Sequence, residues 1–265
     1  MVAVLVSRYP RVDTPTWKRG LASDLLEAGF DLHVVYSRSS LAAQVQAGLA
    51  EFGAAGAARR FAEGRLPSRR APAGGPAPAQ SLAVWAEQRG APVHRFARLG
   101  DDDCLARLSE LAPDLLVLAG ADLVPRSVLA IPRVATVNGH YGLLPAYRGM
   151  NVTEWSIYHD DPVGVSVHVV DPGIDTGDIL LRRAIPVPTG ASLESLRAKH
   201  QETARALLAE AAVGLRDGGL APTPQSPEDG RQFYRMHPVL RERAEAKLRD
   251  GTYAWLDRDV TGITP

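Results

Sequence analysis

Cysteine, long apolar runs and an excess of one charge are all missing from this sequence. Cys104 is the only cysteine among 265 residues, so an intramolecular disulfide is impossible and a thiolate zinc site is nearly excluded. No stretch approaches the length of a membrane span. The apolar run at the start is too short for a signal peptide and soon meets Arg8 and Pro10. We therefore expect a cytoplasmic protein without a metal and without membrane association.

The positive and negative charges balance. Lys and Arg together number 30, as do Asp and Glu, so the formal net charge is zero. Proteins that bind nucleic acids or anionic membranes usually carry an excess of basic residues. Hydrophobic residues make up 45% of the chain, which suits a globular protein with one sizeable core. The composition thus argues against a nucleic acid or an anionic membrane as a partner.

Short apolar runs alternate with helical patterns in the first half of the chain. Runs that suit strands buried on both faces occur at residues 2–6, 30–37, 114–120 and 133–138. A further strand is expected at 91–96, and helices at 17–29, 41–52 and 126–130. This alternation predicts an α/β fold whose doubly wound, mostly parallel sheet is covered by helices on both faces.

The pattern changes after Asn151. A helix is expected at residues 151–161. Valines at every second position from Val163 to Val169 then predict a strand, with His168 on its opposite face and without an assigned role. A second strand is expected at 177–187, and Ser192 is placed to cap a long helix.

Asn138, His140 and Asp175 form the candidate chemical set. Asn138 and His140 stand two apart at the end of an expected strand, so their side chains point the same way. Asp175 lies in a glycine-broken loop between two expected strands. Acyl transfer to an amine needs a proton acceptor, which His140 provides, and a donor to the developing oxyanion, such as the Asn138 amide. Asp175 can orient the imidazole, raise its pKa and help to pass the proton to the leaving nitrogen.

Each of these residues also has a structural alternative. Asn138 precedes Gly139 and can form a turn. His140 can be a buried histidine with satisfied hydrogen bonds, and Asp175 can cap its own loop. Taken singly, none of the three decides between catalysis and structure.

Taken together, the motifs resemble the folate-dependent formyltransferase family. The family pattern is Asn-x-His, then Leu-Leu-Pro and Arg-Gly, and later Asp-x-Gly before an apolar strand. The matching positions are Asn138, His140, Leu143–Pro145, Arg148–Gly149 and Asp175–Gly177. The resemblance implies a doubly wound α/β domain that moves a formyl group from 10-formyltetrahydrofolate to an amine. It also implies that Asn138, His140 and Asp175 are the catalytic set.

The resemblance places folate contacts on two loops, one after the strand at 114–120 and one before Asp175. The residues implied are Gly120, Ala121, Asp122, Leu123, Val124, Val170, Asp171, Gly173 and Ile174. Gly142 departs from the family, which often has serine before Leu-Leu-Pro, but this change removes no reacting group.

The acceptor is expected to be the amine of a small molecule, such as an amino sugar or a natural-product precursor. The glycine-rich phosphate loop of glycinamide ribonucleotide formyltransferases has no match after the first strand, and the tail does not resemble the β-barrel of methionyl-tRNA formyltransferases. Candidate acceptor contacts are Tyr9, Arg11, Trp17, Tyr147, Arg148 and Glu154. A formyltetrahydrofolate hydrolase is the alternative enzyme, and a non-catalytic folate-binding module is a third possibility.

We divide the chain into a formyltransferase-like catalytic domain at 1–220 and a short helical extension at 221–265. The Pro/Gly-rich residues 65–80 predict a mobile insertion in the first. The amphipathic segment Val239–Arg249 predicts a helix that covers a sheet edge or forms a homodimer contact. A solvated helix with paired charges is the simpler alternative.

Overall fold

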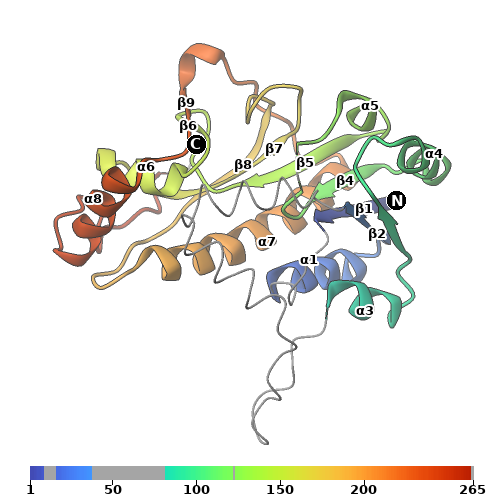
Figure 1. Cartoon of the computed structure of the whole chain (residues 1–265), viewed down its shortest axis with the longest axis horizontal. Helices are drawn as coiled ribbons and strands as arrows, with labels where there is room; N and C mark the ends of the chain where they lie inside the picture. The colour runs from blue at the N-terminus through green and yellow to red at the C-terminus, as the bar shows by residue number, and fades with distance from the viewer. Residues whose placement is uncertain (9–15, 38–80, 122, 264–265) are drawn as a thin grey trace, which may run out of the picture.

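A computed structural model describes residues 1–8, 16–37, 81–121 and 123–263. Its centre is a seven-stranded sheet with the order β3-β2-β1-β4-β5-β7-β8. The first five strands in this order are parallel, and β7 and β8 are each antiparallel to the strand before (Figure 1). The strands are β1 (Val2–Arg8), β2 (Asp31–Ser37), β3 (Val93–Phe96), β4 (Leu115–Leu118), β5 (Ala135–His140), β7 (Gly164–Val169) and β8 (Ile179–Ala184). The predicted mostly parallel α/β sheet is confirmed.

Helices cover both faces of the sheet. On one face lie α1 (Thr16–Glu27), α3 (Leu82–Glu87) and α7 (Leu193–Asp217); on the other lie α4 (Asp102–Leu111) and α5 (Arg126–Leu129). Successive residues of a strand point to opposite faces, so β1 serves both cores. Ala3 and Leu5 pack into the core under α1 and α7, and Val4 and Val6 pack into the core under α4.

The long helix α7 supports the strands that carry the candidate site. Ser192 caps it in a reciprocal capping box with Ser195, as the sequence predicts, and Gly218 ends it with a φ of 67°. The helix contacts β5, β7 and β8. The polar ends of β5 and β7 therefore rest on a rigid element.

The C-terminal residues fold back onto the segment that follows β5. β9 (Arg231–Phe233) pairs in parallel with β6 (Tyr147–Gly149), and α8 (Pro238–Arg249) packs on α6 (Val152–His159). A 3-10 turn, Pro227–Asp229, precedes β9. The helix predicted at Val239–Arg249 is confirmed as α8. The homodimer contact and the domain boundary at 220 stay predictions.

The structure contains several helices and strands that the sequence analysis does not predict, and some predicted segments lie outside the described residues. The sequence patterns do not predict α3, α4, β6 or β9. The helix expected at 41–52 and the insertion at 65–80 lie outside the described residues. Within the part of the chain that the structure describes, no helix has both the length and the apolar character needed to cross a membrane.

Candidate active site

The antiparallel pairing of β5 with β7 places polar side chains next to one another. Asn138 lies opposite His168, and His140 lies opposite Ser166. Gly139 points the other way, toward α7, where a Cβ atom would come within 3.2 Å of Leu208 Cδ1. Gly139 therefore lets α7 pack closely behind β5 while Asn138 and His140 face away from the helix.

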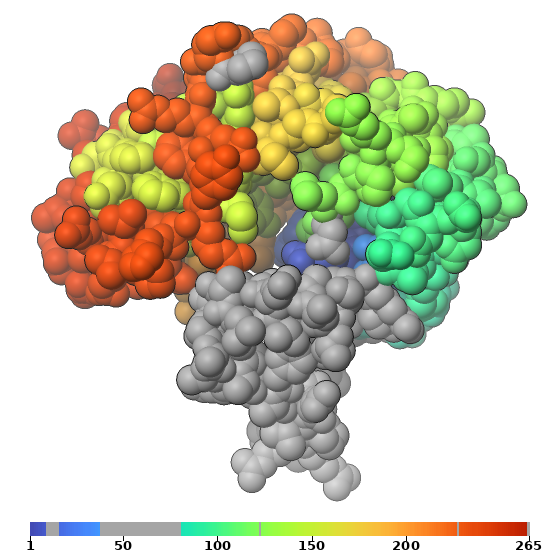
Figure 2. All heavy atoms as spheres, turned by 45° about the horizontal axis from the view of Figure 1, so that its top comes forward, coloured from blue at the N-terminus to red at the C-terminus, as the bar shows by residue number. Residues whose placement is uncertain are grey.

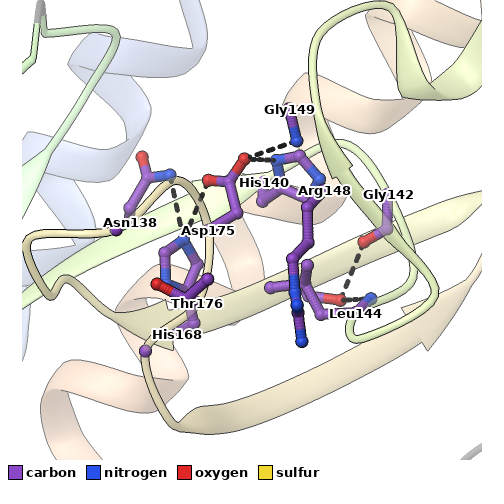
Figure 3. A network of polar contacts seen from close by, with 12 residues as sticks. Asn138, His140, Gly142, Leu144, Arg148, Gly149, His168, Asp175 and Thr176 are labelled. Carbon is purple, nitrogen blue, oxygen red and sulfur yellow. Dashed lines mark hydrogen bonds and ion pairs between the residues drawn. The ribbon is translucent and has the colours of Figure 1, made fainter. Parts of the chain in front are cut away.

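Asp175 joins the two histidines of this region. Its Oδ2 atom lies 3.3 Å from His140 Nδ1, and its Oδ1 atom lies 3.4 Å from His168 Nε2 (Figure 3). The backbone N–H of Gly149 donates to Oδ2 at 2.9 Å. Asn138 Nδ2 lies 3.3 Å from His168 Nε2. The three residues singled out in the sequence thus gather in one cluster, with His168 as a fourth member.

The backbone at Asp175 is in a conformation that few residues adopt. Its φ is 54°, in the left-handed region, which costs a residue other than glycine roughly 1–3 kcal/mol. The loop is closed by Asp171, whose Oδ1 atom accepts from Thr176 Oγ1 at 2.7 Å and from the Gly173 N–H at 3.1 Å. This loop conformation directs the Asp175 carboxylate toward the histidines.

Burial and charge set the protonation of the cluster. Burial raises the pKa of Asp175, but the hydrogen bond from His168, the charge of His140 and the Gly149 N–H together lower it to about 2. Burial lowers the pKa of His140 below its usual 6.5, and the Asp175 carboxylate opposes this only in part. At neutral pH the pair is therefore an ionised carboxylate beside a neutral imidazole.

The partners of His140 indicate which nitrogen carries its hydrogen. Nε2 lies 2.8 Å from the carbonyl oxygen of Tyr147, an acceptor, so the neutral ring donates there. The lone pair of Nδ1 then faces Asp175 Oδ2 at 3.3 Å. A proton arriving between these two atoms would bridge them, so the His140–Asp175 pair is built to accept a proton.

A pocket of about 380 Å³ opens beside the cluster. Asn138, His168 and Asp175 line it, whereas His140 is only 7% exposed and is not among the described lining residues. The other lining residues come from four segments: Leu118, Ala121, Leu123 and Val124; Gly149 and Met150; Val170, Gly173 and Ile174; and Gln232, Phe233 and Tyr234. Figure 2 shows the molecule hollowed between the green segment after β4 and the orange C-terminal segment.

Most residues expected to contact folate lie at this pocket. Ala121, Leu123, Val124, Val170, Gly173 and Ile174 line it. Gly120 and Asp171 belong to the same loops without being among the lining residues, and Asp171 closes its own loop. Asp122 lies outside the described residues. Folate contact by this set stays a prediction.

The described residues among those expected to bind the acceptor are buried or packed against other parts of the protein, and none is among the lining residues of the pocket. Tyr147, Arg148 and Glu154 are buried. Tyr147 donates through its hydroxyl to Asp161, and Arg197 forms an ion pair with Glu154 at 2.9 Å.

Trp17 packs against the apolar core, and Tyr9 and Arg11 lie outside the described residues. Direct contact of any of the six with an acceptor stays a prediction.

His168 and the tail residues of the pocket are not identified by the sequence patterns. The alternation of β7 placed His168 opposite the valines, which left its surroundings open. The signal that could identify it is register, because pairing β5 with β7 sets His168 directly opposite Asn138. Gln232 to Tyr234 include the end of a strand of three residues, too short for a periodic pattern.

Gly142, where the family often has serine, lies in a position with little space for a side chain. A Cβ atom there would lie 2.9 Å from His140 Nε2 and 2.9 Å from the Tyr147 carbonyl oxygen. The backbone around Gly142 is fixed by Ser166, whose Oγ atom donates to the Gly142 carbonyl at 2.8 Å and accepts from the Leu144 N–H at 2.9 Å. Glycine therefore lets this loop pack directly on the His140 ring.

Comparison with known proteins agrees with the motifs. The model of the family described as formyl transferase matches residues 74–212, slightly more than half of the chain. The chain belongs to the formyl transferase family. Its matched region holds Asn138, His140, His168 and Asp175 together.

Curated relatives of this formyl transferase include two methionyl-tRNA formyltransferases. The one from Citrifermentans bemidjiense is 32% identical over 192 residues, which is 69% of this chain and 57% of the relative. The one from a Synechococcus species (strain JA-2-3B'a(2-13)) is 39% identical over 146 residues, 54% of this chain and 45% of the relative. The chain thus spans about half the length of the curated relatives it matches.

Solved structures share the fold of this formyl transferase. A sugar N-formyltransferase from a Shewanella species has a TM-score of 0.57 and 15% identity, covering 94% of this chain and 88% of its own. An N-formyltransferase from Helicobacter canadensis, solved with folinic acid and dTDP-3-aminofucose, has a TM-score of 0.59 and 13% identity, covering 94% and 81%. At these identities the likeness establishes the fold alone.

Proposed function

We propose that this chain transfers a formyl group from 10-formyltetrahydrofolate to the amine of a small molecule. The observation that carries the proposal is the Asp175 carboxylate, which contacts His140 and His168 and lines a pocket of about 380 Å³. Membership of the formyl transferase family supports a one-carbon transfer at this place. The Helicobacter canadensis enzyme, which was solved with folinic acid and an amino sugar nucleotide, supports the two substrate classes.

The reduced folate would occupy the pocket between the two predicted loops. Leu123, Val124, Val170 and Ile174 offer apolar walls for its flat ring, and Asn138 and Asp175 offer polar groups. The formyl carbon would then lie at the Asn138 end of the pocket. This arrangement leaves the amine to approach from the open side.

The amine attacks the formyl carbon and forms a tetrahedral intermediate. The Asn138 Nδ2–H group donates to the oxyanion that develops. The amine must also lose a proton. Asp175 lines the pocket, and the Nδ1 lone pair of His140 lies behind it, so the proton passes to the Asp175–His140 pair and returns to the nitrogen of tetrahydrofolate as it leaves.

A second candidate acceptor is the amine of methionyl-tRNA. It is favoured by the names of the curated relatives, which are 32% and 39% identical to this chain. The balanced composition, with 30 basic and 30 acidic residues, supports the small molecule instead. Hydrolysis of 10-formyltetrahydrofolate is the alternative in which water takes the place of the amine.

The experiment is a turnover assay with a panel of acceptors. The protein is incubated with 10-formyltetrahydrofolate and nucleotide-linked amino sugars, free amino acids or methionyl-tRNA, and tetrahydrofolate release and product mass are followed. We expect a small amine to gain one formyl group. Tetrahydrofolate release at the same rate without any amine would instead identify a hydrolase, and formylation of methionyl-tRNA alone would identify the second acceptor.

A matched pair of variants ties turnover to the cluster. Asp175→Asn removes the charge between the histidines, whereas Asp102→Asn makes the same change at an exposed carboxylate on α4. Activity is expected to fall at least about 100-fold in the first and to persist in the second. Equal activity in both variants would mean that the reaction does not depend on the Asp175 cluster.

A further inference from the structure

We propose that Gln225 is the positioning residue of Asp175, so that the C-terminal segment completes the candidate active site. The inference deepens the proposed function and rests on it for the identity of the reaction. Gln225 lies beyond residues 74–212, which the family model matches. No motif in the sequence assigns it a role.

The side chain of Gln225 holds the backbone of the Asp175 loop. Its Nε2 atom donates to the carbonyl oxygen of Asp175 at 3.1 Å and to that of Gly177 at 2.5 Å. These carbonyls belong to the residues directly before and directly after Thr176. One amide group therefore fixes the loop on both sides of Thr176.

Arg148 fixes the orientation of the Gln225 amide. The Oε1 atom of Gln225 accepts from Arg148 Nε at 3.2 Å and from Arg148 Nη2 at 3.0 Å. A guanidinium only donates hydrogen bonds, so the oxygen of the amide must face it, and the NH₂ group must face the loop carbonyls. Arg148 is 4% exposed and also donates to the Ser226 carbonyl at 2.7 Å. Arg148, a buried side chain of the Arg-Gly motif, thus turns the NH₂ group of Gln225 toward the Asp175 loop.

The segment that carries Gln225 is itself anchored to the sheet. Thr223 and Ile179 at the start of β8 exchange two backbone hydrogen bonds, each 2.8 Å long. Gln225 follows two residues later. Its amide therefore projects from a fixed point of the main sheet rather than from a free tail.

Asp175 needs such an external hold because its own backbone disfavours the site conformation. Its φ of 54° is left-handed, and an unrestrained loop would leave that region. Rotation of the backbone at Asp175 would swing the carboxylate away from His140 Nδ1 and the Gly149 N–H. In an enzyme site a displacement on the order of 1 Å can cost about 100-fold in rate.

The test compares Gln225→Met with Gln88→Met. Methionine keeps the length of glutamine but has no amide, and Gln88 is an exposed glutamine at the end of α3. We expect Gln225→Met to lower kcat about 10- to 100-fold while the KM of folate and of amine each change less than about threefold. Gln88→Met is expected to behave as the wild type.

A second readout needs no substrate. The imidazole of His140, assigned by its loss in His140→Ala, is titrated by NMR in both variants. The groups whose charge or hydrogen bonding acts on it are the Asp175 carboxylate, His168, the Tyr147 carbonyl and, from α7, His200. The carboxylate raises the pKa of His140 against burial, so its departure in Gln225→Met is expected to move the titration to lower pH.

The outcomes separate this proposal from the proposed function. A fall in kcat with an unmoved His140 titration would mean that Gln225 serves only the fold and would overturn the positioning role, as would no change in either readout. If the wild type formylates no acceptor but the His140 titration still moves in Gln225→Met, the positioning role of Gln225 is upheld and the proposed function is rejected. If Gln225→Met does not fold, Gln225→Glu replaces it in the test. Its side chain keeps an acceptor for Arg148 but lacks the amide donors, so its kcat is expected to fall by the same factor as in Gln225→Met.

Discussion

Strand β4 and the neighbouring pair β5–β7 bury different kinds of side chain. β4 buries Leu115 to Leu118 without a polar group, whereas β5 and β7 bury His140, Ser166 and His168. A buried polar group without a partner costs about 1–3 kcal/mol, but each of these three has a hydrogen bond. Strand β4 therefore stabilises the fold, and the β5–β7 pair carries buried polar groups that belong to the candidate site.

The largest effect expected is on activity, at the site beside the β5–β7 pair. Asp175→Asn removes the charge that contacts both histidines and leaves the shape of the side chain intact. We expect kcat to fall about 10²- to 10⁴-fold, the usual range for a lost proton-transfer group, and the unfolding free energy at neutral pH to fall by no more than about 2 kcal/mol, the stabilisation that the ionised carboxylate supplies. Steady-state kinetics and urea unfolding measure the two quantities. A loss of unfolding free energy clearly above about 2 kcal/mol would contradict this contrast between β4 and the β5–β7 pair.

The reverse result is expected in β4. Leu116 is fully buried in β4 between β1 and β5, so Leu116→Ala leaves a cavity and should cost about 2–5 kcal/mol of unfolding free energy. The kcat of the folded fraction at low temperature should match the wild type. Urea unfolding and kinetics on the same sample test this, and a large loss of kcat in folded protein would contradict the division.

The pH dependence of stability gives a smaller effect. The pKa of Asp175 is about 2 in the folded protein and near 3.8 when unpaired. A lowered folded pKa stabilises the protein above the unfolded pKa, and this stabilisation is lost as pH falls from 3.8 toward 2. The full difference is about 2 kcal/mol.

Urea unfolding of the wild type and Asp175→Asn between pH 6 and about pH 3 measures this linkage. The wild type is expected to lose stability relative to the variant only below about pH 4. A stability difference that stays constant across this range would show that the carboxylate is not held by the histidines.

The smallest effect is expected at the rim of the pocket. Tyr234 is 71% exposed and Leu123 is 82% exposed, and both line the pocket from different segments. If they flank a folate ring, Tyr234→Ala should raise the KM of folate about two- to tenfold and leave kcat unchanged. Val84→Ala, at another exposed position, is the control. A change in the KM of the amine alone would place Tyr234 on the acceptor side.

The sequence predicts the apolar elements better than the connections between them. β1, β2, β4 and α7 follow from runs of Val, Leu and Ala because burial imposes a period. Asn138, His140 and Asp175 follow from motif spacing and meet in space. His168 and Gln225 could not be found in this way, because a role set by strand register or by a hydrogen bond across 50 residues leaves no local pattern.

The most direct test of formyl transfer follows the formyl carbon itself. The protein is given 10-formyltetrahydrofolate labelled at that carbon, together with the amine that the acceptor panel identifies, and the label is followed by NMR. We predict that the label appears in the formamide of the product with wild-type protein and remains on folate with Asp175→Asn. Label that appears as free formate, or that reaches the amine equally with both proteins, would contradict formyl transfer through the Asp175 cluster.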